Sequence, residues 1–374
     1  MAYNQDRSRG GGGRGDQRGS RGRGGDRGGD RQRTPSRQTL PESYDLYVRY
    51  PTETEDDVRR IIGNHPKAYN ELESTHTRIS LLATSLVERT KEFSKSGHRK
   101  FGGGYPNLLH NKRGVNEYTK TIIQPALEQL KMLEMYPPKV DVNTLPLLSF
   151  FIQFRFTLTR PFYSRDDDQF YIHENPVMKE NVFKVPMVRP SSWKGTLRGT
   201  ATKVAAKYPK LVNELFGYAR GDDDSEDPGQ RSRLIFYPTF FDAIDLDMIN
   251  PHSRRTKAGT VPITLEVVPP GATGYFTLVY VPFNLIGLGE KVIRTRLAGD
   301  MLITVQTIER TMCRYGFSAK RNRGYGLVDQ QLPARTKSEP SGQLHLKGEP
   351  LHTFRSFSEL NKIAGQLIKK ISRQ

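Results

Sequence analysis

The segment from Gly316 to Gly326 has the residue types that can hold a chain of phosphates. It reads GFSAKRNRGYG, so glycines surround Lys320, Arg321 and Arg323. Glycine permits positive φ and a close approach to a ligand, and successive backbone N–H groups in such a loop form an anion-binding concavity. The pattern predicts a loop that holds a phosphodiester backbone without reading bases. The alternative is a basic hairpin turn that simply needs glycine.

A second candidate phosphate site is predicted within residues 185–203, which read VPMVRPSSWKGTLRGTATK. Ser191 and Ser192 are expected to cap a helix that follows a strand, and Lys194 and Arg198 lie four residues apart on one face of that helix. A helix N-terminus offers unpaired N–H groups and the positive end of a dipole to an anion. These residues therefore predict a second contact to phosphate.

The overall charge favours a polyanionic partner. The chain has 58 Lys and Arg against 40 Asp and Glu, which gives a net charge of +18 and a pI near 9.8. An excess of this size accelerates association with polyanions. The sequence shows no apolar run of membrane-spanning length, no signal peptide and no basic amphipathic anchor at its start, so nucleic acid is favoured over a membrane surface. A single cysteine, Cys313, excludes an intramolecular disulfide and a multi-cysteine zinc site.

Residues 1–38 differ in composition from the rest of the chain. They contain 11 glycines, 10 arginines and 4 aspartates, with repeated Arg-Gly-Gly units. So few apolar groups cannot offset the entropy lost on folding, and a disordered tail is predicted. Such a tail either contacts single-stranded nucleic acid through charge and guanidinium stacking or only solubilises the chain.

Residues 39–138 are predicted to form a helical segment. Apolar residues recur at helical spacing in two stripes, Asn116 is a plausible N-cap of the second helix, and Pro137-Pro138 ends it. The connection at 96–114 mixes basic residues, aromatics and a glycine triplet. It is either an RNA-contacting loop or a solvated link between helices.

An α+β domain is predicted over residues 139–335. Phe150 to Leu158 alternates in polarity like a half-buried strand, and further strand-like runs follow a helix that begins near residue 192. A long helix from Glu290 to Tyr315 leads into the glycine-rich loop. This order is typical of a ferredoxin-like or RRM-like sandwich. Within it, Trp193 is expected in the core. The remaining 336–374 form a C-terminal extension whose amphipathic helix is expected to pack on the domain.

Two motifs together resemble the RAMP superfamily of CRISPR-associated proteins. They are a strand followed by Pro-Ser-Ser-x-Lys-Gly-x-x-Arg and a loop ending in Lys-x-x-Arg-Gly-Tyr-Gly, and the resemblance covers roughly residues 145–330. A stretch with Asp-x-x-Asn-Pro-His at 247–252 is similar to a terminal subunit of the type III-B (Cmr) effector complex. The resemblance implies a cytoplasmic RNA-binding subunit that holds guide RNA among other subunits, without a cofactor. Contact with target RNA is left open.

The residues implied to contact RNA come from both motifs. They are Ser191, Ser192, Lys194, Arg198, Gly316, Ser318, Lys320, Arg321, Arg323, Gly324 and Gly326. Ser318 stands where the family usually has glycine, and it is expected to donate a hydrogen bond to phosphate.

The catalytic candidates are weak. Glu174 stands where target-cutting family members have aspartate, so it is expected to be non-catalytic. His173 and His252 have side chains that can act as acid–base groups, but they are expected to be structural or surface residues. The run 166–168 of three aspartates is expected to be a solvated loop rather than a metal site. Two alternatives stay open: an endoribonuclease that cuts guide precursor or target RNA, and a general RNA-binding protein that joins an RRM-like domain to the Arg/Gly tail.

Overall fold

The computed structural model describes residues 45–374, with gaps at 64, 86–87, 97–103, 110–115, 168–170, 220–228, 252–254, 256–258, 260–261, 334–340 and 374. The chain divides into two units, Met1–Tyr44 and Asp45–Gln374, and every described residue belongs to the second. The predicted Arg/Gly tail, most of the 96–114 connection, Asp168 and His252 lie outside the described residues.

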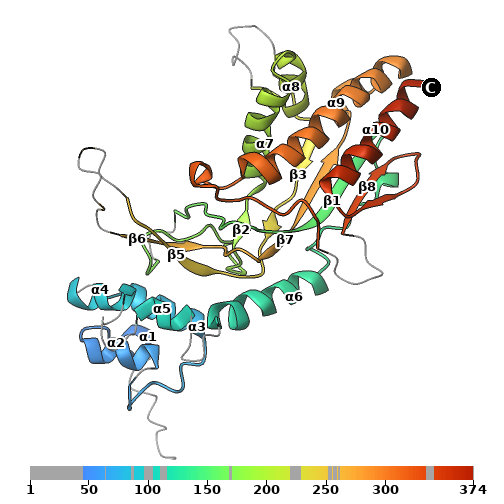
Figure 1. Cartoon of the computed structure of the whole chain (residues 1–374). Coiled ribbons are helices and arrows are strands. Elements are labelled where there is room, and N and C mark those ends of the chain that lie inside the picture. Colours follow the sequence, from blue (N-terminus) through green and yellow to red (C-terminus); the bar gives the residue numbers. More distant parts are fainter. Residues whose placement is uncertain are drawn as a thin grey trace, which may run out of the picture. The chain divides into compact units, whose positions relative to one another are not determined.

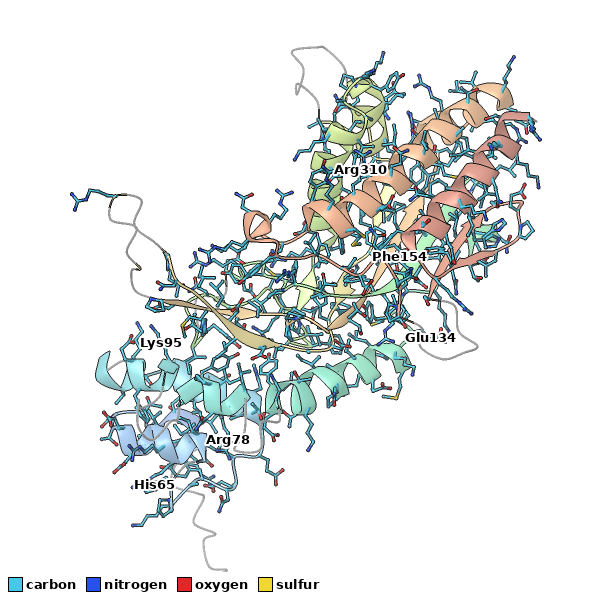
Figure 2. All side chains as sticks on the ribbon, viewed as in Figure 1. His65, Arg78, Lys95, Glu134, Phe154 and Arg310 are labelled. Atoms are coloured by element: carbon cyan, nitrogen blue, oxygen red, sulfur yellow. The ribbon has the colours of Figure 1, made fainter. Side chains whose placement is uncertain are left out.

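The first described part is helical, as predicted. Its elements are α1 (Leu46–Arg49), α2 (Glu55–Ile62), α3 (Thr75–Ala83), α4 (Glu88–Ser96), α5 (Gly104–Leu109), the π-helix η1 (Thr119–Ile123) and α6 (Gln124–Met132). Thr54 and Asp57 form a capping box at the start of α2. The Asn116 side chain accepts from the Thr119 N–H at 2.8 Å, so the predicted N-cap is confirmed. Arg78 (Figure 2) ties α2 to α3 by donating to the carbonyls of Leu72 and Ile61.

An antiparallel sheet forms the centre of the second part. Its strands lie in the order β3-β7-β1-β8-β9. Their bounds are β1 (Phe150–Thr157), β3 (Leu234–Phe236), β7 (Thr273–Tyr280), β8 (Gly342–Leu346) and β9 (His352–Phe354). Pairing of β1 with both β7 and β8 places Phe154 opposite Phe276 and Gly342. The C-terminal extension therefore contributes two strands to the same sheet as β1.

Three helices cover one face of this sheet (Figure 1). They are α7 (Pro190–Val204), α9 (Glu290–Arg310) and α10 (Phe357–Arg373); α9 packs against both of the others. The predicted apolar face of β1 is confirmed, since Phe150, Ile152, Phe154 and Phe156 are all buried. On the opposite face, the Gln153 amide donates to the carbonyl of Pro138 at 2.8 Å, just beyond α6. The mixed α+β class is confirmed.

Shorter elements complete the described residues. They are α8 (Pro209–Phe216), the strand pair β2 (Met187–Val188) and β4 (Thr239–Phe240), the hairpin of β5 (Asp245–Ile249) and β6 (Ile263–Val267), the 3-10 turns η2 (Val142–Thr144), η3 (Phe283–Leu285) and η5 (Arg321–Arg323), and the π-helix η4 (Thr311–Tyr315). After the glycine-rich loop, Val328 makes an isolated bridge to Leu158. Across the described helices, none is both long and apolar enough to cross a membrane.

A buried ion cluster joins the sheet to α9. The Arg233 guanidinium, which is fully buried, donates to Asp300 at 2.7 Å and to Glu214 at 3.2 Å. The Tyr280 hydroxyl donates to the same Asp300 oxygen at 2.8 Å. Burial raises the pKa of Asp300, and the charge of Arg233 opposes that shift. Because the charges of Arg233 and Asp300 are both removed from water, each is stable only while its partner is present.

We expect Asp300→Asn to lower the free energy of unfolding by about 3–5 kcal/mol, because it leaves the buried Arg233 charge without its main partner. Urea unfolding followed by circular dichroism measures the change. The matched control is Lys131→Ala, which breaks the exposed pair with Glu128 and should cost under about 0.5 kcal/mol. Equal effects of the two substitutions would contradict this account of the cluster.

Candidate nucleic-acid interface

An aromatic contact joins the two motifs that the sequence singled out. The Trp193 ring, in the first turn of α7, lies 4.6 Å from the Phe317 ring of the glycine-rich loop, measured between centroids. Phe317 also contacts Phe156 of β1 and Phe162, at 5.7 and 5.5 Å. Trp193 is fully buried and donates its indole N–H to Thr239 at 3.0 Å. Its expected place in the core is confirmed, and both motifs are anchored in one core.

The base of the loop needs glycine at two positions. Gly316 and Gly326 both have φ near +73°, and a Cβ on Gly316 would lie 2.4 Å from the Tyr325 carbonyl oxygen. A Cβ on Gly326 would lie 2.7 Å from the Ser318 nitrogen. Gly324 also has positive φ, +79°, but a Cβ there would meet nothing within 4 Å. The glycines therefore first serve the packing of the loop on itself.

Most backbone donors of the loop are used within the protein. The N–H groups of six loop residues donate to carbonyls of the chain: Gly316, Phe317, Ala319, Arg323, Gly324 and Gly326. Two of these bonds tie the loop to the segment after β1, from Ala319 to Tyr163 and from Gly326 to Pro161. The expected concavity of free N–H groups is therefore much reduced. The side chains of the tip carry most of its capacity to bind an anion.

The Ser318 hydroxyl is also committed to the protein. It donates to the Tyr163 carbonyl at 2.8 Å and accepts from the Tyr163 N–H at 2.9 Å, and the residue is buried. The expectation that it donates to phosphate does not describe its use in this structure. A hydroxyl can satisfy both backbone groups of Tyr163 at once, which glycine at this position cannot do.

The tip of the loop presents cations. Arg321 and Arg323 are exposed and Lys320 is half-buried, on or beside the 3-10 turn η5. Within the described part of the chain, none of the three has a carboxylate partner within ion-pair distance. Unpaired cations held on a short, anchored turn are suited to a phosphate backbone.

The start of α7 differs from the prediction in one respect. The N-cap is Arg189, and Pro190 takes the first helical position, because its fixed φ suits that position and its missing N–H costs nothing there. Ser191 and Ser192 therefore lie inside the first turn and do not cap the helix. Both are exposed, and their backbone N–H groups lie where a helix has no acceptor of its own. This start remains available to an anion.

Lys194 and Arg198 lie together on α7. Partial burial lowers the pKa of Lys194, and the neighbouring charge of Arg198 lowers it further. Arg198 approaches the Asn213 side chain of α8 at 3.4 Å, so this pair marks the side of α7 that faces α8, whereas Trp193 marks the side that faces the loop. A bound phosphate would relieve the repulsion between the two cations.

Two further cations, which were not predicted from the sequence, lie beside these motifs. Arg160 is exposed between Thr159 and Pro161, which hydrogen-bond to the loop at Leu327 and Gly326. Arg189, the N-cap of α7, is exposed and approaches Asp167 at 3.9 Å. The Thr-Arg-Pro run at 159–161, shortly after β1, could have indicated Arg160. Arg189 stands immediately before the Pro-Ser-Ser motif.

The weak catalytic candidates lie elsewhere, beside a cavity of about 850 Å³ that the β5–β6 hairpin also lines. Glu174 is exposed and pairs with Lys95 at 2.5 Å, which lowers the pKa of Glu174. His173 accepts the Asn175 N–H on Nδ1 at 3.1 Å, and burial lowers its pKa. Asp166 accepts the N–H groups of Asp167 and Lys179. Within the described residues, no three metal-binding side chains gather in one place.

Comparisons with known proteins place the chain in a family. The model of the RAMP superfamily matches residues 101–329, and the chain belongs to this superfamily. A search of curated proteins found no match. Among solved structures, a chain of the type III-B Cmr-beta complex bound to cognate target RNA is 13% identical, with a TM-score of 0.39 over 75% of this chain and 92% of that one. A chain of the Csm3–Csm4 subcomplex of the type III-A interference complex is 15% identical, with a TM-score of 0.33 over 59% and 98%.

Gly316→Ala should destabilise the protein more than Gly324→Ala. Both place alanine at positive φ, which costs about 1–2 kcal/mol, but only Gly316→Ala drives a Cβ into backbone, which adds about 1–3 kcal/mol. Thermal unfolding of the two variants measures the difference. A Gly324→Ala variant that proved the less stable would refute the packing role assigned to Gly316.

Proposed function

We propose that this chain binds the backbone of a guide RNA as a subunit of a type III CRISPR effector complex. The observation that carries the proposal is the contact between Trp193 and Phe317. It holds the start of α7 beside a loop whose Lys320, Arg321 and Arg323 have no carboxylate partner among the described residues. Both elements suit phosphate, and neither presents a rigid set of groups for reading bases.

Membership of the RAMP superfamily and the net charge of +18 support an RNA partner. The Asp-x-x-Asn-Pro-His motif at 247–252 supports the narrower proposal of a terminal subunit in a Cmr-type complex. The partners are then guide RNA and neighbouring subunits, in the cytoplasm. Target RNA can meet this chain through pairing with the guide.

We also infer a ferredoxin-like core for the RNA-binding domain. The strand order β3-β7-β1-β8, with α7 between β1 and β3 and α9 between β7 and β8, supports this topology. In that arrangement the loop after α9 and the start of α7 both lie at crossovers of the sheet. Contacts at this position would be made to the RNA backbone alone, so sequence specificity would come from base pairing with the guide.

The variant Lys320→Ala/Arg321→Ala/Arg323→Ala should bind single-stranded RNA more weakly and with a flatter salt dependence. Each phosphate contact on a single strand contributes about 0.7 to the slope of log K against log salt, so three lost contacts reduce that slope by about 2. Fluorescence anisotropy with a labelled RNA at several salt concentrations measures both quantities.

The matched control removes the same charge from α10. Lys362→Ala/Lys369→Ala/Arg373→Ala changes three exposed cations on that helix and should leave the slope within about 0.5 of the wild-type value. If both triple variants flattened the slope equally, the loop would have no special role and only net charge would matter.

We expect the full chain to leave labelled RNA intact, with or without divalent cations. Glu174 is held ionised by Lys95, and His173 Nδ1 is occupied by a backbone N–H, so neither is arranged as a free acid–base pair. Gel electrophoresis after prolonged incubation tests this. Cleavage that disappeared in Glu174→Gln or His173→Ala would instead establish the endoribonuclease.

A further inference from the structure

A cavity of about 500 Å³ lies between the helical segment and the α+β domain. It is lined by three groups of residues: His76, Ile79 and Ser80 of α3; Tyr118; and residues between 166 and 189, including Asp166, Tyr171, Lys179, Glu180, Lys184 and Arg189. A volume of this size falls within the range of small-molecule sites. The wall mixes cations, carboxylates and aromatic rings.

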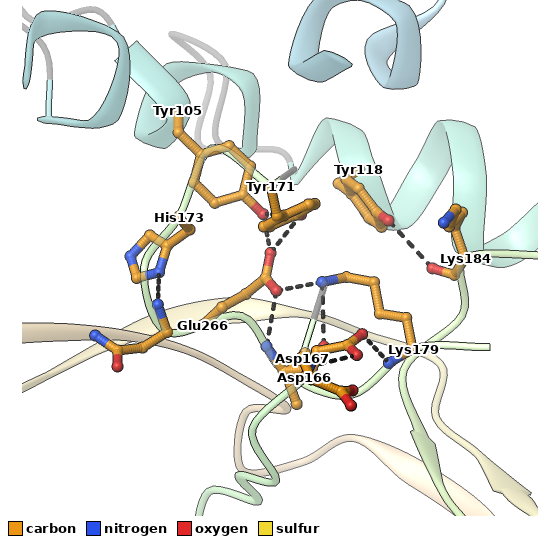
Figure 3. A network of polar contacts seen from close by, with 11 residues as sticks. Tyr105, Tyr118, Asp166, Asp167, Tyr171, His173, Lys179, Lys184 and Glu266 are labelled. Carbon is orange, nitrogen blue, oxygen red and sulfur yellow. Dashed lines mark hydrogen bonds and ion pairs between the residues drawn. The ribbon is translucent and has the colours of Figure 1, made fainter. Parts of the chain in front are cut away.

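One wall of the cavity is rigid (Figure 3). The buried Glu266 carboxylate accepts from the Tyr171 hydroxyl at 2.8 Å, from the Val177 N–H at 2.9 Å, and also from Tyr105 and Lys179. Lys179 also lies over the Tyr171 ring, 4.3 Å from its centroid. Because Glu266 neutralises Lys179, this lysine is part of the wall and is not free to bind an anion.

Two of the three remaining carboxylates of the cavity are committed to backbone donors, and the third, the exposed Asp167, lies 3.9 Å from Arg189. Glu180 accepts the N–H groups of Val182 and Phe183 at 2.7 and 2.6 Å. Asp166 accepts the N–H groups of Asp167 and Lys179 at 2.9 and 3.1 Å. Each N–H group partly offsets the charge of the carboxylate that it contacts.

Lys184 and His76 are differently placed. In the described part of the chain neither has a carboxylate within ion-pair distance. The backbone of Lys184 is fixed, with φ of 55° and its carbonyl accepting from the Tyr118 hydroxyl at 3.1 Å. The pKa of His76 is lowered by partial burial and then by the charge of Lys184. Lys184 is therefore a cation without a counter-ion, and an anion bound beside it would also favour protonation of the neutral His76 ring.

Arg189 connects the cavity with the candidate interface. It lines the cavity and is also the N-cap of α7. A nucleic-acid strand held at the start of α7 is therefore separated from the cavity by about the length of the Arg189 side chain. Ser80 and Asn181, which also line the cavity, can supply both acceptors and donors, as the edge of a nucleobase requires.

We propose that this cavity binds one nucleoside phosphate, with the phosphate on Lys184, His76 and Arg189 and the base against the polar wall. The source of the bound nucleotide rests on the proposed function: it is one nucleotide unstacked from the RNA held at α7. A free mononucleotide offers the same chemistry, so the two sources must be separated by experiment.

The test uses the full chain and the proton resonances of the His76 ring, assigned with His76→Asn. Titration with adenosine, guanosine, cytidine and uridine 5′-monophosphates should raise the pKa of His76, because a bound phosphate stabilises the imidazolium. Lys184→Gln should weaken the binding of the mononucleotides about tenfold. Lys369→Gln, at an exposed position of α10, should leave the binding of the mononucleotides unchanged.

A second arm adds single-stranded RNA. If the strand supplies the nucleotide, RNA raises the pKa of His76 and displaces the mononucleotide. Simultaneous binding of both would overturn the strand as the source. No response of His76 to any mononucleotide or to RNA would overturn the site itself.

The loop variant Lys320→Ala/Arg321→Ala/Arg323→Ala separates this inference from the proposed function. It should bind mononucleotides like the wild-type chain while it binds RNA weakly. A wild-type chain that failed to bind RNA but bound mononucleotides would contradict the proposed function and leave the cavity assignment standing.

Discussion

The candidate interface depends on the contact between Trp193 and Phe317. The glycine-rich loop and α7 are more than 100 residues apart in the sequence, and each presents cations. Aromatic burial anchors both elements, because Phe317 packs on Trp193 and also on Phe156 and Phe162 beneath the loop. The charged tip needs no internal ion pairs to stay in place, so its cations remain free for a partner.

The loop divides its chemistry between its base and its tip. At the base, Gly316, Gly326 and Ser318 satisfy backbone groups and steric limits. At the tip, Arg321 and Arg323 are exposed. Side-chain cations on a short turn adapt to a curved strand more easily than a fixed set of N–H groups does. We therefore infer binding that is strong at low salt and tolerant of sequence, as the proposed function requires.

Periodicity was enough to predict the long elements. The alternating apolar residues of β1 and the helical spacing of α9 and α10 reflect local rules. Strands β8 and β9 were not predicted, because short strands such as Gly342–Leu346 gain their stability from pairing with β1 almost 200 residues earlier. The predicted serine cap of α7 was wrong because proline takes the first helical position and places the serines inside the first turn. Ser318 was misjudged because its partner, Tyr163, lies 155 residues away.

The same dependence on residues far away in the sequence explains why the buried position of Glu266 was not predicted. In the sequence it is one polar residue in the strand β6, a pattern typical of a solvent-facing position. In the structure it is fully buried and surrounded by donors from Tyr105, Tyr171, Val177 and Lys179. A buried carboxylate is costly unless all its lone pairs are used, so the network is stable only when Tyr105 of α5 and the α+β domain are in place together. The helical segment therefore completes the core of the RAMP domain and cannot be treated as a separate attachment.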